Sequence, residues 1–97
     1  QPVDVEVSGI AANALGARRV GQICFDLARS QNIQAVTVAD QAIASAQAML
    51  WHNMRQFVEP AGAAALAALM SGAYQPIKGE KVAVLICGAN PAPDPFL

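Results

Sequence analysis

The segment 80–88 constrains the fold of this chain more than any other part of it. It reads EKVAVLICG, so an unbroken apolar run leads into Cys87-Gly88-Ala89-Asn90 and then a proline. A short run rich in valine, leucine and isoleucine is typical of a strand buried on both faces, as in parallel sheets covered by helices. Such sheets bind ligands just beyond the carboxyl ends of their strands. The sequence therefore predicts an α/β fold with its chemistry at residues 87–90.

The composition indicates one small domain that is incompletely covered. The 97 residues are 55% hydrophobic and 13% charged, whereas globular domains are usually about 25% charged. A surface so poor in charge suggests apolar faces that something else covers. We therefore expect residues 1–97 to be a single partial domain, an excerpt whose main partner is the remainder of a longer polypeptide.

Charge and residue counts exclude several functional classes. A net charge of −1 with six basic residues does not provide the basic surface that nucleic-acid binding requires. No apolar stretch approaches the ~20 residues that span a bilayer. Two cysteines and one histidine predict neither a disulfide framework nor a metal site. The expected protein is cytoplasmic and binds neither nucleic acid, membrane nor metal.

Hydrophobic periodicity and turn residues predict the order of elements. An apolar stripe with helical spacing begins near Ala14, and a second one follows Asp40, a predicted N-cap. Glu59-Pro60 predicts the start of an alanine-rich helix that Gly72 ends. The predicted order is helix, strand, helix, helix, strand, over residues 14–29, 33–38, 41–54, 60–71 and from 81 onward. Residues 91–97 form a predicted extended, proline-rich tail.

Two motifs resemble those of a known family. The stretch 59–69, EPAGAAALAAL, followed after a gap by KVAVLICGAN at 81–90, resembles the carboxyl-terminal catalytic-domain segment of the serine/threonine dehydratases. These are pyridoxal-phosphate enzymes of the tryptophan-synthase-β-like fold, fold type II. The resemblance implies that Cys87 lies opposite the pyridine nitrogen of the cofactor and that Gly88 lets the backbone approach the ring. It places Glu59 near the cofactor pocket, and it implies that Asn90, the last residue of the cofactor-binding motif, holds the loop through hydrogen bonds to the backbone.

The resemblance also implies an activity for the intact parent enzyme. Such an enzyme performs β-elimination on a small hydroxy amino acid and releases a 2-oxo acid and ammonia, and it is expected to be a homo-oligomer. Threonine, serine and hydroxyaspartate enzymes and racemases share these motifs, so the substrate stays open. The cofactor-binding lysine and the glycine-rich phosphate loop have no match in residues 1–97. We therefore expect no catalytic residue in this chain, and expect the chain alone to be inactive and to bind no cofactor.

Alternatives remain open at this level. Without the resemblance, Cys87 is interpreted as a buried core thiol. Glu59 is equally compatible with capping the helix that begins at Pro60. The whole chain is also compatible with a non-catalytic α/β association module or a self-associating fragment.

Overall fold

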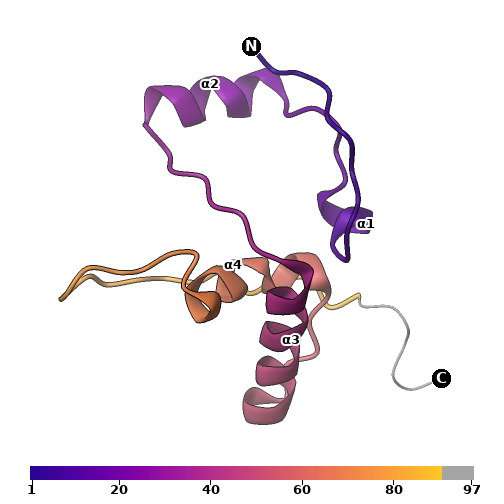
Figure 1. Ribbon diagram of the computed structural model, residues 1–97, viewed down its shortest axis with the longest axis vertical. Coiled ribbons are helices and arrows are strands. Elements are labelled where there is room, and N and C mark those ends of the chain that lie inside the picture. The colour runs from indigo at the N-terminus through magenta and orange to yellow at the C-terminus, as the bar shows by residue number, and fades with distance from the viewer. Residues whose placement is uncertain (91–97) are drawn as a thin grey trace. The chain divides into compact units, whose positions relative to one another are not determined.

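The computed structural model describes residues 1–90, apart from the side chain of Asn13. The chain divides into two compact units, residues 1–35 and residues from 36 onward. In the described part, the first unit contains helices α1 (Ala12–Leu15) and α2 (Gln22–Ser30), and the second contains α3 (Asp40–Met54) and α4 (Pro60–Ser71) (Figure 1). The predicted proline-rich tail, 91–97, lies outside the described residues. None of the helices in residues 1–90 has the length and apolar character that crossing a membrane requires.

The predicted α/β fold is wrong for the described residues. Neither 33–38 nor 81–87 forms a strand in residues 1–90, so the order helix, strand, helix, helix, strand is not observed. A strand exists only when its backbone groups form a hydrogen-bond ladder with a neighbouring strand. The backbone bond recorded for Cys87 runs instead to helix α4. Apolar, β-branched composition without a paired neighbour leaves both segments irregular.

The predicted helix 14–29 is also wrong over its first half. The chain makes only the short α1 and then leaves helical geometry until Gln22. Two glycines bracket this break, and Gly21 takes an extended conformation (φ −66°, ψ 148°). In addition, Val5 N–H donates to Arg18 O at 2.8 Å, and Asp4 pairs with Arg19 at 2.7 Å. These contacts hold residues 18 and 19 outside a helix, and glycine favours the break because it costs about 1 kcal/mol within a helix.

Helix α2 exposes the apolar stripe whose spacing predicted a helix. None of its residues is buried, and Ile23 is 78% exposed. The helix ends at Ser30, after which Asn32 adopts a left-handed conformation (φ 51°) and Ile33 N–H donates to Ala28 O at 3.0 Å. Asparagine tolerates this conformation at a helix end better than most residues.

Helices α3 and α4 pack against each other and form the buried core of the second unit. Pro60 at the first turn of α4 and Gly72 (φ 82°) after its last turn confirm the predicted bounds. The N-cap of α3 is Ala39, so the prediction of Asp40 as N-cap is wrong by one residue. The buried apolar side chains are those of Ile43, Ala46, Leu50, Val58, Ala63 and Ala67. Small alanines on α4 let the larger residues of α3 approach its backbone closely.

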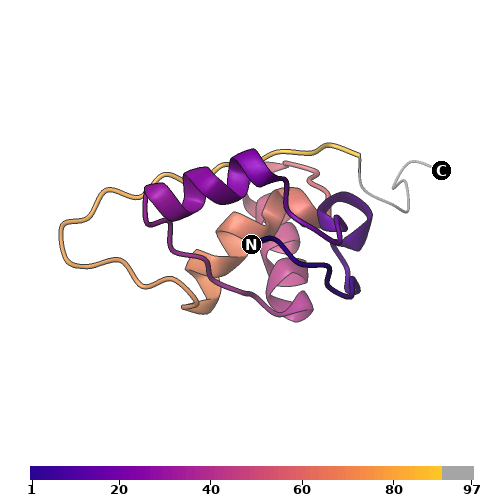
Figure 2. The same ribbon diagram turned by 90° about the horizontal axis from the view of Figure 1, so that it is seen from above.

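The chain returns to the beginning of α4 after leaving its end. Both ribbon views show the segment after α4 running out, turning and coming back along the helix (Figure 1, Figure 2). The turn is closed by Glu80 N–H donating to Ile77 O at 3.0 Å, with Gly79 at φ 83°. A glycine suits this position because other residues rarely adopt a positive φ. The return path places residues 87 and 88 against the start of α4.

A hydrogen bond between the side chains of Tyr74 and Glu80 closes the loop between these two residues. The Tyr74 hydroxyl donates to the Glu80 carboxylate, whose other oxygen accepts from Ile77 N–H at 3.2 Å. This hydrogen bond is the largest cause of a raised Tyr74 pKa, followed by partial desolvation and repulsion from the Glu80 charge. A raised pKa favours the protonated phenol in the folded chain. Its contribution to stability is therefore present below the ordinary tyrosine pKa and is lost as pH rises through the higher folded value.

Removing Glu80 is expected to lower the pKa of Tyr74 toward the ordinary value of about 10. Tyr74 is the only tyrosine in the chain, so an alkaline titration followed by tyrosinate absorbance reports on this side chain alone. The Glu80→Ala variant should titrate at lower pH than the unmodified chain, while Glu6→Ala, a control in the other unit, should not. Equal midpoints for Glu80→Ala and the unmodified chain would contradict the contact.

Candidate functional site

The two sequence motifs meet at the amino-terminal end of α4. Glu59 N–H donates to Gly88 O at 2.9 Å, and Cys87 N–H donates to Gly62 O in a longer bond of 3.5 Å. Each of these bonds joins a residue of one motif to a residue of the other. Three of the four predicted site residues, Glu59, Cys87 and Gly88, are thus brought together by backbone contacts.

Glu59 occupies the N-cap position of α4 without capping it through its side chain. Its backbone is extended (φ −66°, ψ 159°), and its carboxylate makes no hydrogen bond to the N–H groups of the first turn. The carboxylate lies over Gly88 instead, since it fills the space that a side chain at residue 88 would take. The partial positive charge at the start of a helix attracts a carboxylate in this place. The Glu59 carboxylate therefore lies at the junction of the two motifs and not on the N–H groups of the helix.

Glycine is required at two positions of this junction. Gly88 has φ 78°, and a Cβ built on it would overlap the Glu59 carboxylate. A Cβ on Gly62 would overlap the carbonyl oxygen of Cys87 and come within 2.8 Å of Val58 Cγ1. Both glycines allow backbone and carboxylate to approach more closely than any side chain would permit. The junction therefore has no room for a side chain at residue 62 or 88.

Cys87 is an exposed free thiol. The interpretation of Cys87 as a buried core thiol is therefore wrong for the described residues. A thiol is a weak hydrogen-bond donor and a weak acceptor, and here it stands next to Gly88, which the Glu59 carboxylate contacts. Asn90, the fourth predicted site residue, is exposed.

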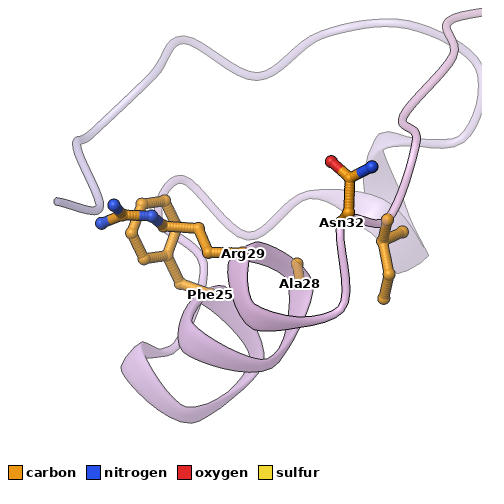
Figure 3. A pocket seen from close by; sticks show the side chains of 5 residues that line it. Phe25, Ala28, Arg29 and Asn32 are labelled. Carbon is orange, nitrogen blue, oxygen red and sulfur yellow. The ribbon is translucent and has the colours of Figure 1, made fainter.

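A separate hollow lies in the first unit (Figure 3). In this view the Arg29 guanidinium lies beside the Phe25 ring, 5.7 Å from the ring centroid. The hollow is lined by Phe25, Ala28, Arg29, Asn32 and Ile33. None of the predicted site residues lines it. Within residues 1–90, no three histidine, cysteine or acidic side chains are grouped so that they could hold a metal ion.

Comparison with known proteins decides the family. The family model described as "Pyridoxal-phosphate dependent enzyme" matches residues 1–88. The chain belongs to this pyridoxal-phosphate-dependent enzyme family. The match includes Glu59, Cys87 and Gly88, so the junction at the start of α4 lies inside the family region.

Individual relatives carry related names. The chain is 34% identical over 90 residues to L-threonine dehydratase biosynthetic IlvA of Escherichia coli K12, covering 92% of this chain and 18% of the relative. It is 33% identical over 89 residues to phenylserine dehydratase of Ralstonia pickettii, covering 92% and 27%. Among solved structures, the T.th. threonine deaminase matches with a TM-score of 0.68 at 27% identity, over 78% of this chain and 28% of that one. The chain therefore spans only 18% to 28% of the length of these proteins.

The sequence analysis did not identify two residues that contribute to the junction at the start of α4. Gly62 carried a signal, because a lone glycine within a run of alanines gives up about 1 kcal/mol of helix propensity and so indicates a position that excludes a side chain. Gln47 donates from Nε2 to Val58 O at 2.9 Å. Its signal was weaker: it is a polar residue four positions after Ile43, on the stripe that faces the core.

Proposed function

We propose that residues 1–97 form part of a pyridoxal-phosphate-dependent ammonia-lyase that acts on a small hydroxy amino acid such as threonine or serine. The reaction breaks the Cα–H and Cβ–O bonds, water leaves, and hydrolysis of the resulting enamine yields a 2-oxo acid and ammonia. The observation that carries the proposal is the junction of Glu59 with Cys87 and Gly88 in a chain of this family. The dehydratase and deaminase names of the relatives support the reaction class.

The residues of the junction fit the cofactor's pyridine ring. Cys87 offers an exposed thiol that can hydrogen-bond a ring nitrogen without forcing a proton onto it, as a carboxylate would. Gly88 presents backbone with no side chain in the way of a flat ring. Glu59 places negative charge beside Gly88, and Asn90 follows in the same segment. When bound, pyridoxal phosphate withdraws electrons from the amino acid's Cα.

This chain is proposed to supply one wall of the active site and none of the catalytic groups. The lysine that binds the cofactor and the loop that holds its phosphate are assigned to the remaining polypeptide, with which residues 1–97 form one catalytic domain. Large exposed apolar side chains, such as those of Ile23 and Leu85, support an assembled, homo-oligomeric enzyme. Free cysteines are typical of reducing compartments, which supports a cytoplasmic location.

Replacing Cys87 tests the proposal. In the full polypeptide, Cys87→Leu is expected to weaken pyridoxal-phosphate binding by about tenfold or more, because a bulky apolar side chain removes the donor and crowds the ring. Cys87→Ser keeps a small hydroxyl donor and should bind nearly as well as the unmodified protein. The affinity of each variant is measured by following the absorbance of the bound cofactor during titration with pyridoxal phosphate.

Cys24→Leu provides the matched control, since Cys24 is also an exposed free thiol but lies on α2. It should leave cofactor binding unchanged. A full polypeptide that takes up no pyridoxal phosphate, or equal binding by Cys87→Leu and Cys24→Leu, would overturn the assignment. Ammonia release measured with threonine and with serine then separates the substrates.

A further inference from the structure

The peptide group that joins Val58 to Glu59 is held from both sides. Its carbonyl oxygen accepts from Gln47 Nε2 at 2.9 Å, and its N–H donates to Gly88 O at 2.9 Å. One partner comes from α3 and the other from the segment that carries Cys87. Two hydrogen bonds on opposite edges of one planar group fix its orientation.

The clamped peptide group sets the position from which the Glu59 side chain extends. Glu59 follows the clamped peptide directly, and its carboxylate lies over Gly88 rather than on the N–H groups of α4. Val58 is buried, and Gln47 is half-buried on α3. The clamp therefore lies in the packed region between the two helices, where water competes poorly for the same carbonyl.

We propose that Gln47 is a positioning residue that holds the 58–59 peptide and so keeps the Glu59 carboxylate over Gly88, beside the ring site at Cys87. The proposal rests on the proposed function and extends it to a residue that touches neither cofactor nor substrate. Gln47 acts through the backbone at Glu59. Its loss is expected to release the carboxylate without removing any group of the site itself.

The Gln47→Glu variant is the sharpest test, because it keeps the shape of the side chain and replaces the donor with an acceptor. Without cofactor, hydrogen exchange of the Glu59 amide should quicken by about fivefold, as expected when a neighbouring hydrogen bond is lost. Gln47→Met removes the donor without adding charge and should give a similar change. If the glutamate variant fails to fold, the methionine variant decides the question.

Gln41 provides matched controls on the same helix, since it is exposed near the start of α3. Gln41→Glu and Gln41→Met should leave exchange of the Glu59 amide unchanged. Exchange at Glu59 that is equal in the Gln47 and Gln41 variants would overturn the clamp. This readout needs no cofactor, so it separates a failure of the clamp from a failure of the proposed function.

A double-mutant cycle tests whether the clamp acts through Glu59. In the cofactor-loaded enzyme, Gln47→Met should shift the cofactor's absorbance and lower kcat more than it raises KM. In a protein that already carries Glu59→Gln, Gln47→Met should change neither the absorbance nor kcat any further, because the carboxylate that Gln47 positions has already been replaced. Additive effects of the two substitutions on absorbance and kcat would show a merely structural role and would refute the proposal.

Discussion

Gly62→Ala is expected to destabilise the second unit, although alanine is the better helix former. Helix propensity alone would make this change stabilising by about 1 kcal/mol. At this position, however, the new Cβ would overlap the Cys87 carbonyl oxygen and press on Val58 Cγ1. Overpacking against backbone costs about 1–3 kcal/mol or more, so the net effect is a loss of stability. The contact between Gly62 and Cys87 should open as well.

Denaturant unfolding followed by the fluorescence of Trp51, the only tryptophan, measures this change. Gly21→Ala is the matched control, because a Cβ at Gly21 would meet no atom within 4 Å and its φ is −66°. That variant should stay within about 1 kcal/mol of the unmodified chain. A Gly62→Ala chain that is more stable than the unmodified one would show that the 87–88 segment does not lie against α4.

Leu50→Ala is expected to cause the largest loss of stability in the second unit, about 2–5 kcal/mol. Leu50 is 2% exposed and is the largest fully buried side chain of the described residues. The buried residues of α4 are Gly62, Ala63 and Ala67, and side chains this small cannot extend to fill the cavity left behind. Because the 58–59 clamp depends on the same helix pair, the substitution should also release the Glu59 junction.

The same denaturant unfolding measurement tests the role of Leu50, and Leu15→Ala is the control variant. Leu15 is 61% exposed, so its truncation should change the free energy of unfolding by no more than about 0.5 kcal/mol. Similar losses for both variants would mean that the α3–α4 contact does not hold the unit together.

The elements that the sequence predicted well are those decided by neighbouring residues. Pro60 and Gly72 delimit α4 because proline suits a first helical turn and glycine suits the left-handed residue after the last one. The predicted stripe of Ile43, Ala46, Leu50, Met54 and Phe57 is confirmed for its first three residues, which are buried, but it is wrong for Met54, which is 59% exposed. The family motifs at 59–69 and 81–90 are likewise continuous stretches of residues, and the family match confirms the resemblance.

The predictions that failed depended on distant partners. Residues 81–87 have the composition of a buried strand but no ladder within the described part of the chain. The stripe at 14–29 has helical spacing, yet Val5 and Asp4 hold residues 18 and 19 outside a helix. A local preference of a few tenths of a kcal/mol per residue does not form a strand without a paired neighbour, and it does not keep a helix intact against competing contacts.

The amino-acid sequence alone determined the family and the bounds of α4, because these depend on residue type and short spacing, and the same motifs predicted the candidate site residues. Only the tertiary structure brought Glu59 to Gly88, showed why Gly62 must lack a side chain, and joined Gln47 to the same peptide. Those contacts link residues between 11 and 29 positions apart in the chain. They arise from the packing of α3 on α4 and the return of the chain after Gly79, which no local pattern specifies.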